Sequence, residues 1–316
     1  MRVPFAAVFP GQGSQSIGMM AAWGEYQSLV EQTFAQAAHV LGGLDLWSVA
    51  SLGPEGEINR TEITQPIMLT AGVAAWRVWQ AAGGAMPICM AGHGLGEYTA
   101  LVCAQAMDFE DAVRVVAERG RLMQEAVPVG AGAMAAVLGL DDAVVLAVCA
   151  EATQGADVVE AVNFNSPGQV VIAGSAAAVA RATPLLQDKG AKRVLPLPVS
   201  VPSHSSMMQD AALQMAKVLD TVEIRRPQIP VLHNVDAAEH AEPTALRAAL
   251  VSQLHRPVLW VDSVRAMQNR GVDALVEFGP GKVLAGLSKR IERDLAAYPV
   301  LDAASMSVAL NEMSEE

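Results

Sequence analysis

The chain has 316 residues, with 21 Lys and Arg against 33 Asp and Glu, which gives a formal net charge of −12. Its hydrophobic content of 52% and charged content of 17% exclude intrinsic disorder as the main state, because enough apolar surface exists to form a core. The acidic balance argues against nucleic acid as a partner, since binding to phosphates requires a positive surface.

Short apolar runs alternate with longer segments of helical spacing in the first part of the chain. The pattern predicts buried strands at 5–9 and 87–91. It predicts helices at 19–40, 65–82, 95–106 and 109–125. Because each strand is followed by a turn and a helix, we predict a parallel α/β sheet.

The middle of the chain has a different order of elements. Strand, helix, strand, strand, helix and strand follow one another at 132–138, 143–151, 158–163, 169–173, 176–189 and 193–197. This is the split βαβ order of a ferredoxin-like unit, and proline-containing segments flank it. We therefore predict a large α/β subdomain from 1–128 and 199–316, a small subdomain at 129–198, and a site in a cleft between them.

The last third of the chain returns to the pattern of the first. We predict a helix near 206–220, a strand near 229–234, and further α/β elements to about residue 293. The segment 302–316 ends in acidic residues, and we expect it to be loosely held.

Cysteine usage and the N-terminus favour a soluble cytoplasmic protein. Cys89, Cys103 and Cys149 have no C-x-x-C spacing, which is typical of reduced thiols. The apolar run at 3–9 is too short for a secretory signal, so we expect no export. Longer uncharged stretches are interrupted by Pro, Gly and amide residues, so we expect no membrane span. Nothing in the sequence demands more than a monomer.

The most informative segment is Gly92-His93-Gly94-Leu95-Gly96, which follows an apolar strand and opens a helix. That is the setting of a nucleophile elbow, G-x-S-x-G, in which a helix N-terminus offers N–H groups to a developing oxyanion. The central residue here is Gly94, so there is no hydroxyl to acylate. Taken alone, the pattern is also compatible with a turn that needs glycine for backbone reasons only.

Further motifs stand in a fixed order along the chain. They are PGQGSQ at 10–15, ITQP at 63–66, ERG at 118–120, NFNSPGQ at 163–169, VPSH at 201–204 and FGPG at 278–281. With the elbow, they resemble the malonyl-coenzyme A:acyl carrier protein transacylases of fatty acid synthesis, over about residues 5–292. The resemblance implies an α/β-hydrolase-like large subdomain with a parallel sheet, an inserted ferredoxin-like small subdomain, and no cofactor.

The resemblance also implies a reaction and its principal residues. In that family an elbow serine attacks the thioester of malonyl-coenzyme A, a histidine takes its proton, and the malonyl group passes to the phosphopantetheine thiol of the carrier protein. Gly94 stands at the nucleophile position and His204 at the base. The backbone N–H groups of Gln12 and Leu95 correspond to the oxyanion hole, and Arg119 to the arginine that pairs with the malonyl carboxylate.

Three other residues take supporting roles by the same resemblance. Gln253 contributes the main-chain carbonyl that orients His204, while Asn165 and Asn234 shape the pocket. Each residue also has an ordinary interpretation: Arg119 as a surface helix arginine, His204 as a structural histidine, and the two asparagines as packing or turn residues.

Other sites and partners follow less directly from the sequence. The remaining histidines have no metal-ligand spacing, and the loop after the first strand lacks a dinucleotide fingerprint, so we assign no metal and no nicotinamide cofactor. Two groups of basic side chains either form local positive surfaces that bind an acidic carrier protein or are ordinary solvated surface charges. They consist of Lys189, Lys192 and Arg193, and of Lys282, Lys289 and Arg290.

Three accounts of Gly94 remain open at this point. The chain is an engineered or selected variant of an active transacylase that has lost its nucleophile, which the other retained residues favour. Alternatively, it is a natural pseudo-enzyme that binds malonyl-coenzyme A or carrier protein without chemistry. Or the elbow descends from a different serine hydrolase. In the first two accounts the chain as written is inactive or severely impaired in acyl transfer.

Overall fold

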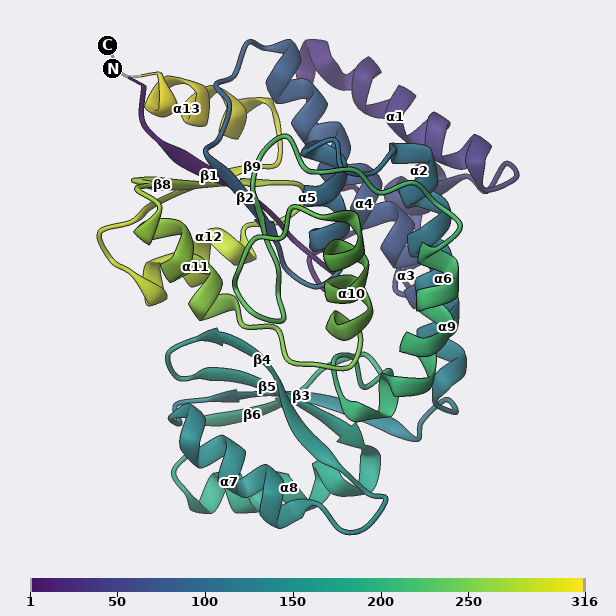
Figure 1. The fold of residues 1–316 in the computed structure, drawn as a ribbon, viewed down its shortest axis with the longest axis vertical. Coiled ribbons are helices and arrows are strands. Elements are labelled where there is room, and N and C mark those ends of the chain that lie inside the picture. Colours follow the sequence, from purple (N-terminus) through teal and green to yellow (C-terminus); the bar gives the residue numbers. More distant parts are fainter. Residues whose placement is uncertain (1, 315–316) are drawn as a thin grey trace.

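The computed structural model describes residues 2–314, which form two sheets with helices around them (Figure 1). The first sheet has five strands in the order β7-β2-β1-β8-β9, and every pairing in it is parallel. The strands are β1 Phe5–Phe9, β2 Cys89–Gly92, β7 Val231–Leu232, β8 Ala274–Phe278 and β9 Ala296–Val300. The predicted parallel α/β sheet is confirmed.

Helices cover both faces of this sheet, which explains why its strands β1 and β2 are uninterrupted apolar runs. Alternate residues of β1 point to opposite sides: Phe5 and Phe9 join the larger core cluster, while Val8 joins a second one. On the larger side lie α1 Gln27–Val40, α2 Leu46–Leu52, α3 Glu55–Ile58, α4 Thr61–Ala81, α5 Gly96–Cys103, α6 Phe109–Ala126, α9 Gln209–Leu219 and α10 Pro243–Gln253. The second cluster is covered by α11 Trp260–Asn269 and α12 Val283–Ile291.

The second sheet is antiparallel, with four strands in the order β4-β5-β3-β6. Its strands are β3 Gly132–Leu138, β4 Val159–Ser166, β5 Gln169–Ser175 and β6 Arg193–Pro196. The helices α7 Asp142–Ala152 and α8 Ala176–Asp188 pack together and against these strands. This is the ferredoxin-like order predicted from the sequence, and the unit lies apart from the larger sheet in Figure 1.

The edge strand β4 joins the small unit to the large one. The N–H of Phe164 donates to the carbonyl of Val258 at 3.0 Å, and the N–H of Val258 donates to the carbonyl of Val162 at 2.8 Å. Nearby, Glu160 accepts hydrogen bonds from both the N–H and the hydroxyl of Ser206. These contacts place β4 beside the loop that carries the VPSH motif.

Two predictions about local structure were wrong. The helix expected at 19–40 begins as the short 3-10 turn Gly24–Tyr26 and becomes α1 only at Gln27, because Gly18 and Met20 have positive φ values of 87° and 65°. The tail expected to be loose forms α13 Ala303–Met313, preceded by β9. Asp302 begins α13 with a capping box, its carboxylate accepting from the N–H of Ser305 at 2.8 Å. Residues 315–316 of that expected tail lie outside the described residues.

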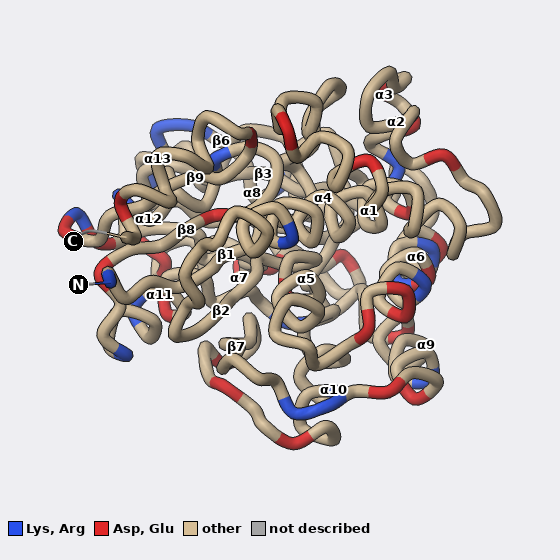
Figure 2. Tube along the Cα trace, turned by 90° about the horizontal axis from the view of Figure 1, so that it is seen from above, with Lys and Arg blue, Asp and Glu red and all other residues tan. Residues whose placement is uncertain are grey.

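The distribution of charged residues agrees with this arrangement of a buried sheet and outer helices. Lys, Arg, Asp and Glu lie mostly on outer helices and loops, while the strands of the five-stranded sheet are nearly free of them (Figure 2). Within residues 2–314, no helix combines the length and the apolarity needed to cross a membrane.

Candidate active site

The turn between β2 and α5 has two positions that only glycine can occupy and a third that favours it. A Cβ at Gly92 would lie 1.8 Å from the carbonyl oxygen of Gly96, and a Cβ at Gly96 would lie 2.1 Å from the carbonyl oxygen of Phe9. Gly94 has a φ of +56°, a left-handed conformation that glycine adopts without strain. Strand, turn and helix therefore approach more closely than side chains would allow, which is the geometry of a nucleophile elbow.

Position 94 faces the imidazole of His204. A Cβ at this position would lie 3.5 Å from Nε2, close enough for a hydroxyl on it to reach that nitrogen. The other ring nitrogen, Nδ1, lies 2.7 Å from the main-chain carbonyl oxygen of Gln253, so Nδ1 carries the proton and donates it. Nε2 is therefore the acceptor nitrogen, and a carbonyl rather than a carboxylate fixes the ring.

His204 is only 7% exposed, and its surroundings oppose protonation. Burial, and then the positive charge of Arg119, lower the pKa of His204 to about 3. The imidazole is thus neutral at neutral pH, which is the state that a proton acceptor requires.

Arg119 is a buried cation with uncharged hydrogen-bond partners. It is 2% exposed, and its two terminal nitrogens donate to the amide oxygens of Gln65 and Gln253, each at 2.8 Å. Its guanidinium lies 5.5 Å from the ring centre of Tyr98, and its Nε has no hydrogen-bond partner. No carboxylate within residues 2–314 forms an ion pair with it. Burial also lowers the pKa of Arg119, because removal from water disfavours its charged form.

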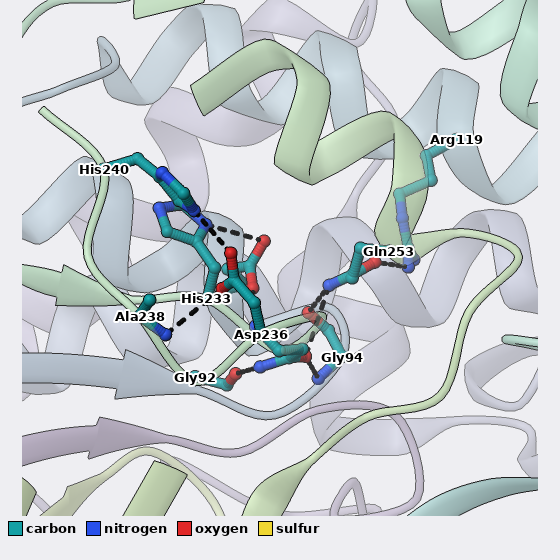
Figure 3. Close-up of polar contacts among 10 residues, drawn as sticks. Gly92, Gly94, Arg119, His233, Asp236, Ala238, His240 and Gln253 are labelled. Atoms are coloured by element: carbon teal, nitrogen blue, oxygen red, sulfur yellow. Dashed lines mark hydrogen bonds and ion pairs between the residues drawn. The ribbon is translucent and has the colours of Figure 1, made fainter. Parts of the chain in front are cut away.

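Gln253, the last residue of α10, connects the parts of the site. Its Oε1 accepts from Arg119, its Nε2 donates to the carbonyl of Gly94 at 2.7 Å, and its main-chain oxygen accepts from His204. Figure 3 shows the side chain between Arg119 and Gly94. One residue therefore sets the spacing between the cation, the elbow and the imidazole.

Asn234 holds the elbow from the other side. Its Oδ1 accepts from the N–H of Gly94 at 2.8 Å, and its Nδ2 donates to the carbonyl of Gly92 at 2.6 Å. The N–H of Asn234 itself donates to Oε1 of Glu97 at 2.6 Å. Because Glu97 lies in the first turn of α5, these bonds join strand, turn and helix into one closed network.

Behind Asn234 lies a group of titratable side chains that the sequence did not single out. Glu97 and His233 are fully buried, with Oε2 and Nδ1 3.3 Å apart. The His233 ring lies 5.2 Å from the ring of His240, which contacts Asp236 at 2.7 Å nearer the surface (Figure 3). In Figure 3, His233 and His240 lie on the opposite side of Gly94 from Arg119.

Asn165 reaches the elbow from the small sheet. Its Oδ1 lies 2.7 Å from Nε2 of His93, the residue before Gly94. The His93 ring packs 5.4 Å from the ring of Trp260, and burial lowers the pKa of His93. The hydrogen bond therefore spans the junction between the two sheets.

Two backbone N–H groups beside the turn have no hydrogen-bond acceptor among the described residues. A Cβ at Gly11 would lie 2.3 Å from the carbonyl oxygen of His93 and 3.5 Å from the nitrogen of Leu95, so the loop after β1 rests directly on the elbow. Neither the N–H of Gln12 nor that of Leu95 has an acceptor among the described residues. The side chain of Gln12 donates to Thr61 at 3.2 Å.

Most of the residues named from the sequence thus meet around one turn. Those placed there directly are Gly94, Leu95, Arg119, Asn165, His204, Asn234 and Gln253. Gln12 lies in the loop that packs on the turn. Sequence reasoning missed three members, Gln65, Glu97 and His233, although Gln65 stands in the ITQP motif. The described residues hold no group of His, Cys, Asp and Glu that could bind a metal.

Comparison with known proteins gives consistent results. A family model described as an acyl transferase domain matches residues 7–308. The chain is 53% identical to the malonyl CoA-acyl carrier protein transacylase of Salmonella typhimurium, over 98% of this chain and 99% of that protein. An acyl carrier protein S-malonyltransferase from Vibrio cholerae superimposes with a TM-score of 0.93 at 52% identity, covering 96% and 99% of the two chains. A malonyl-transacylase solved with its type II PKS acyl-carrier protein gives a TM-score of 0.95 at 53% identity, covering 97% and 99%.

Proposed function

The chain belongs to the acyl transferase family, among its malonyl-coenzyme A:acyl carrier protein transacylases, and we propose that its site binds malonyl-coenzyme A without forming an acyl-enzyme. The observation that carries the proposal is Arg119, a buried cation bonded only to uncharged amides. A buried cation with no carboxylate in direct contact is unfavourable, and the free carboxylate of a malonyl group supplies that contact.

The distance between the cation and the elbow suits a short diacid. Gln253 bonds to both Arg119 and Gly94, so a single side chain separates the two ends of the site. A carboxylate on the guanidinium then leaves the thioester carbonyl of a three-carbon acyl group near position 94. An acetyl group has no carboxylate and therefore cannot form this charge-assisted hydrogen bond with Arg119.

The remaining chemistry is divided among the residues at the turn. The N–H groups of Gln12 and Leu95 stabilise negative charge on the thioester oxygen, and Nε2 of His204 accepts a proton from an attacking group. A transacylase also needs an oxygen on residue 94 to hold the malonyl group between the two half-reactions. Gly94 provides none, so transfer to a carrier thiol through an ester is excluded.

We also propose an acyl carrier protein as the macromolecular partner. The solved complex of a related malonyl-transacylase with its carrier supports this assignment. The side chains of Lys189, Lys192 and Arg193 are exposed just before and at the start of β6, where Figure 2 shows a basic stretch on an otherwise acidic chain. Such a stretch suits an acidic partner.

Calorimetric titration of the purified chain with malonyl- and acetyl-coenzyme A tests the binding proposal. We expect malonyl-coenzyme A to bind about 10- to 100-fold more tightly, since a hydrogen bond to a charged group contributes about 1.5–3 kcal/mol. Equal affinities would contradict the role of Arg119 and would favour descent of the elbow from a different hydrolase.

A further inference from the structure

The space left by the absent side chain lies next to a proton acceptor. A Cβ at Gly94 would meet only Nε2 of His204 within 4 Å, apart from its chain neighbours, so nothing else occupies that side of the turn. A serine at this position would place its hydroxyl there. The group that glycine lacks is close in size to a water molecule, which takes up about 30 Å³ in the liquid.

The imidazole is oriented for any oxygen that enters this space. Because Nδ1 of His204 donates to the carbonyl of Gln253, Nε2 carries the lone pair, and it lies 3.5 Å from where a Cβ of residue 94 would be. The ring is fixed by its own backbone as well, since the N–H of His204 donates to the carbonyl of Leu254 at 3.1 Å. The base is therefore positioned independently of residue 94.

We propose that this chain is a slow malonyl-coenzyme A hydrolase, in which a water molecule beside Nε2 of His204 takes the place of the serine hydroxyl. The proposal rests on the proposed function, because Arg119 and the N–H groups of Gln12 and Leu95 must first hold the thioester. It differs from transacylation in that no covalent intermediate forms and no carrier thiol is required.

The reaction balances with water as the only co-reactant. The water oxygen forms a bond to the thioester carbon while its proton passes to Nε2 of His204, and the carbonyl electrons move onto the oxygen held by Gln12 and Leu95. The tetrahedral intermediate then collapses, the carbon–sulfur bond breaks, and the proton on Nε2 passes to the sulfur. The products are malonate and coenzyme A, and His204 returns to its neutral form.

The expected rate is low but measurable. Serine hydrolases that have lost their nucleophile retain about a thousandfold acceleration over the uncatalysed reaction, from substrate binding and the oxyanion hole. Because a positioned general base adds about a further hundredfold, we expect coenzyme A to be released from malonyl-coenzyme A roughly 10⁵-fold faster with this protein than in buffer.

The test follows thiol release in water enriched in heavy oxygen, with calorimetry on each variant. We expect one labelled oxygen in the malonate. Replacing the base by His204→Gln should lower the rate by about a hundredfold or more. Gly94→Ala should also lower it at least about tenfold, because its methyl group fills the space beside Nε2. Both variants should still bind malonyl-coenzyme A.

Three results would separate the possible failures. If the wild-type chain binds malonyl-coenzyme A but releases thiol at the buffer rate, the hydrolase proposal is overturned while the proposed binding function stands. Equal release by wild type and His204→Gln overturns it too, since the activity then comes from elsewhere in the preparation. If the wild-type chain does not bind malonyl-coenzyme A, both proposals fail.

Discussion

Arg119 places a positive charge where its two hydrogen-bond acceptors are glutamine amides. Arg119→Met removes the charge and should weaken malonyl-coenzyme A binding by about 10- to 100-fold, with little change for acetyl-coenzyme A. Arg121→Met is the matched control, because Arg121 lies on the same helix but is exposed and paired with Glu118 and Glu125. Titration calorimetry measures both. A similar loss in the two variants would contradict a carboxylate clamp at residue 119.

Position 94 decides whether an acyl group can be held covalently. Gly94→Ser should restore malonyl transfer to a carrier thiol, because the new hydroxyl lies within reach of Nε2 of His204. It should also lower the free energy of unfolding by about 1–2 kcal/mol, since a side chain is strained at a φ of +56°. Transfer of labelled malonyl and urea denaturation check the two effects. Gly94→Ala carries the same backbone strain without the hydroxyl and should lose stability without gaining transfer.

The predictability of the site differs from residue to residue. The elbow could be recognised because Gly92 to Gly96 are contiguous and their spacing has a backbone cause. Gln65 and Glu97 could not be assigned to the site, because their contacts are long-range: 54 residues separate Gln65 from Arg119, and 137 separate Glu97 from Asn234. Which buried polar groups pair across such separations depends on packing of the whole chain rather than on local pattern.

Helix α5 stabilises the elbow through Glu97, whose Oε1 accepts the N–H of Asn234. Glu97→Ala leaves that buried N–H unpaired and should lower the free energy of unfolding by about 1–3 kcal/mol. Glu97→Gln keeps an acceptor oxygen and should cost less. Thr99→Val is the control on the same helix, because the buried hydroxyl of Thr99 has no hydrogen-bond partner. Denaturant midpoints measure the effect of each variant. If Glu97→Gln and Glu97→Ala lower the midpoint by the same amount, the hydrogen bond to Asn234 does not contribute as proposed.

Helix α13 packs in the core although acidic residues follow it in the sequence. Met306 is 3% exposed, so Met306→Ala should lower the free energy of unfolding by about 2–5 kcal/mol through the cavity it leaves. Val308 lies on the same helix and is 54% exposed, so Val308→Ala should change stability little. Thermal denaturation distinguishes the two variants. Comparable melting temperatures would mean that the helix is not packed as described.

Elements with a strong period were predicted better than those fixed by single contacts. The strands at 5–9 and 132–138 agree with the structure to the residue, because their apolar runs end at clear turn residues. The start of α1 was wrong because positive φ at Met20 cannot be read from a helical spacing. The last helix was missed because its start depends on one capping box at Asp302, a short signal beside an acidic end.

At the scale of the whole molecule, the two sheets meet through polar contacts close to the site. Asn165 reaches His93, and Glu160 accepts from Ser206, two residues after His204. The fold class was predictable because each unit has its own order of strands and helices. The way the units dock was not, because these contacts involve isolated polar side chains.

The buried histidines should make stability depend on pH. His204 has a pKa of about 3 in the folded protein, so it is neutral there, whereas in the unfolded chain it takes up a proton below its ordinary value of 6.5. Its contribution is therefore fully present above pH 6.5 and is lost as the pH falls toward 3, by at most about 1.4 kcal/mol per pH unit. Urea midpoints from pH 7 to 4 should fall less steeply for His204→Gln than for wild type. If the urea midpoints of wild type and His204→Gln fall equally with pH, the imidazole of His204 is not held neutral by burial.

The two ends of the described chain meet, since the N–H of Val3 donates to the carbonyl of Met313, and Figure 1 shows them at the opposite end of the molecule from the small sheet. A longer polypeptide could therefore carry this unit as an insertion, with both connections leaving from the same place on its surface. Joining the ends by a short linker would give a ring that could be reopened at the exposed turn near Gly155, a circular permutant with the same interior.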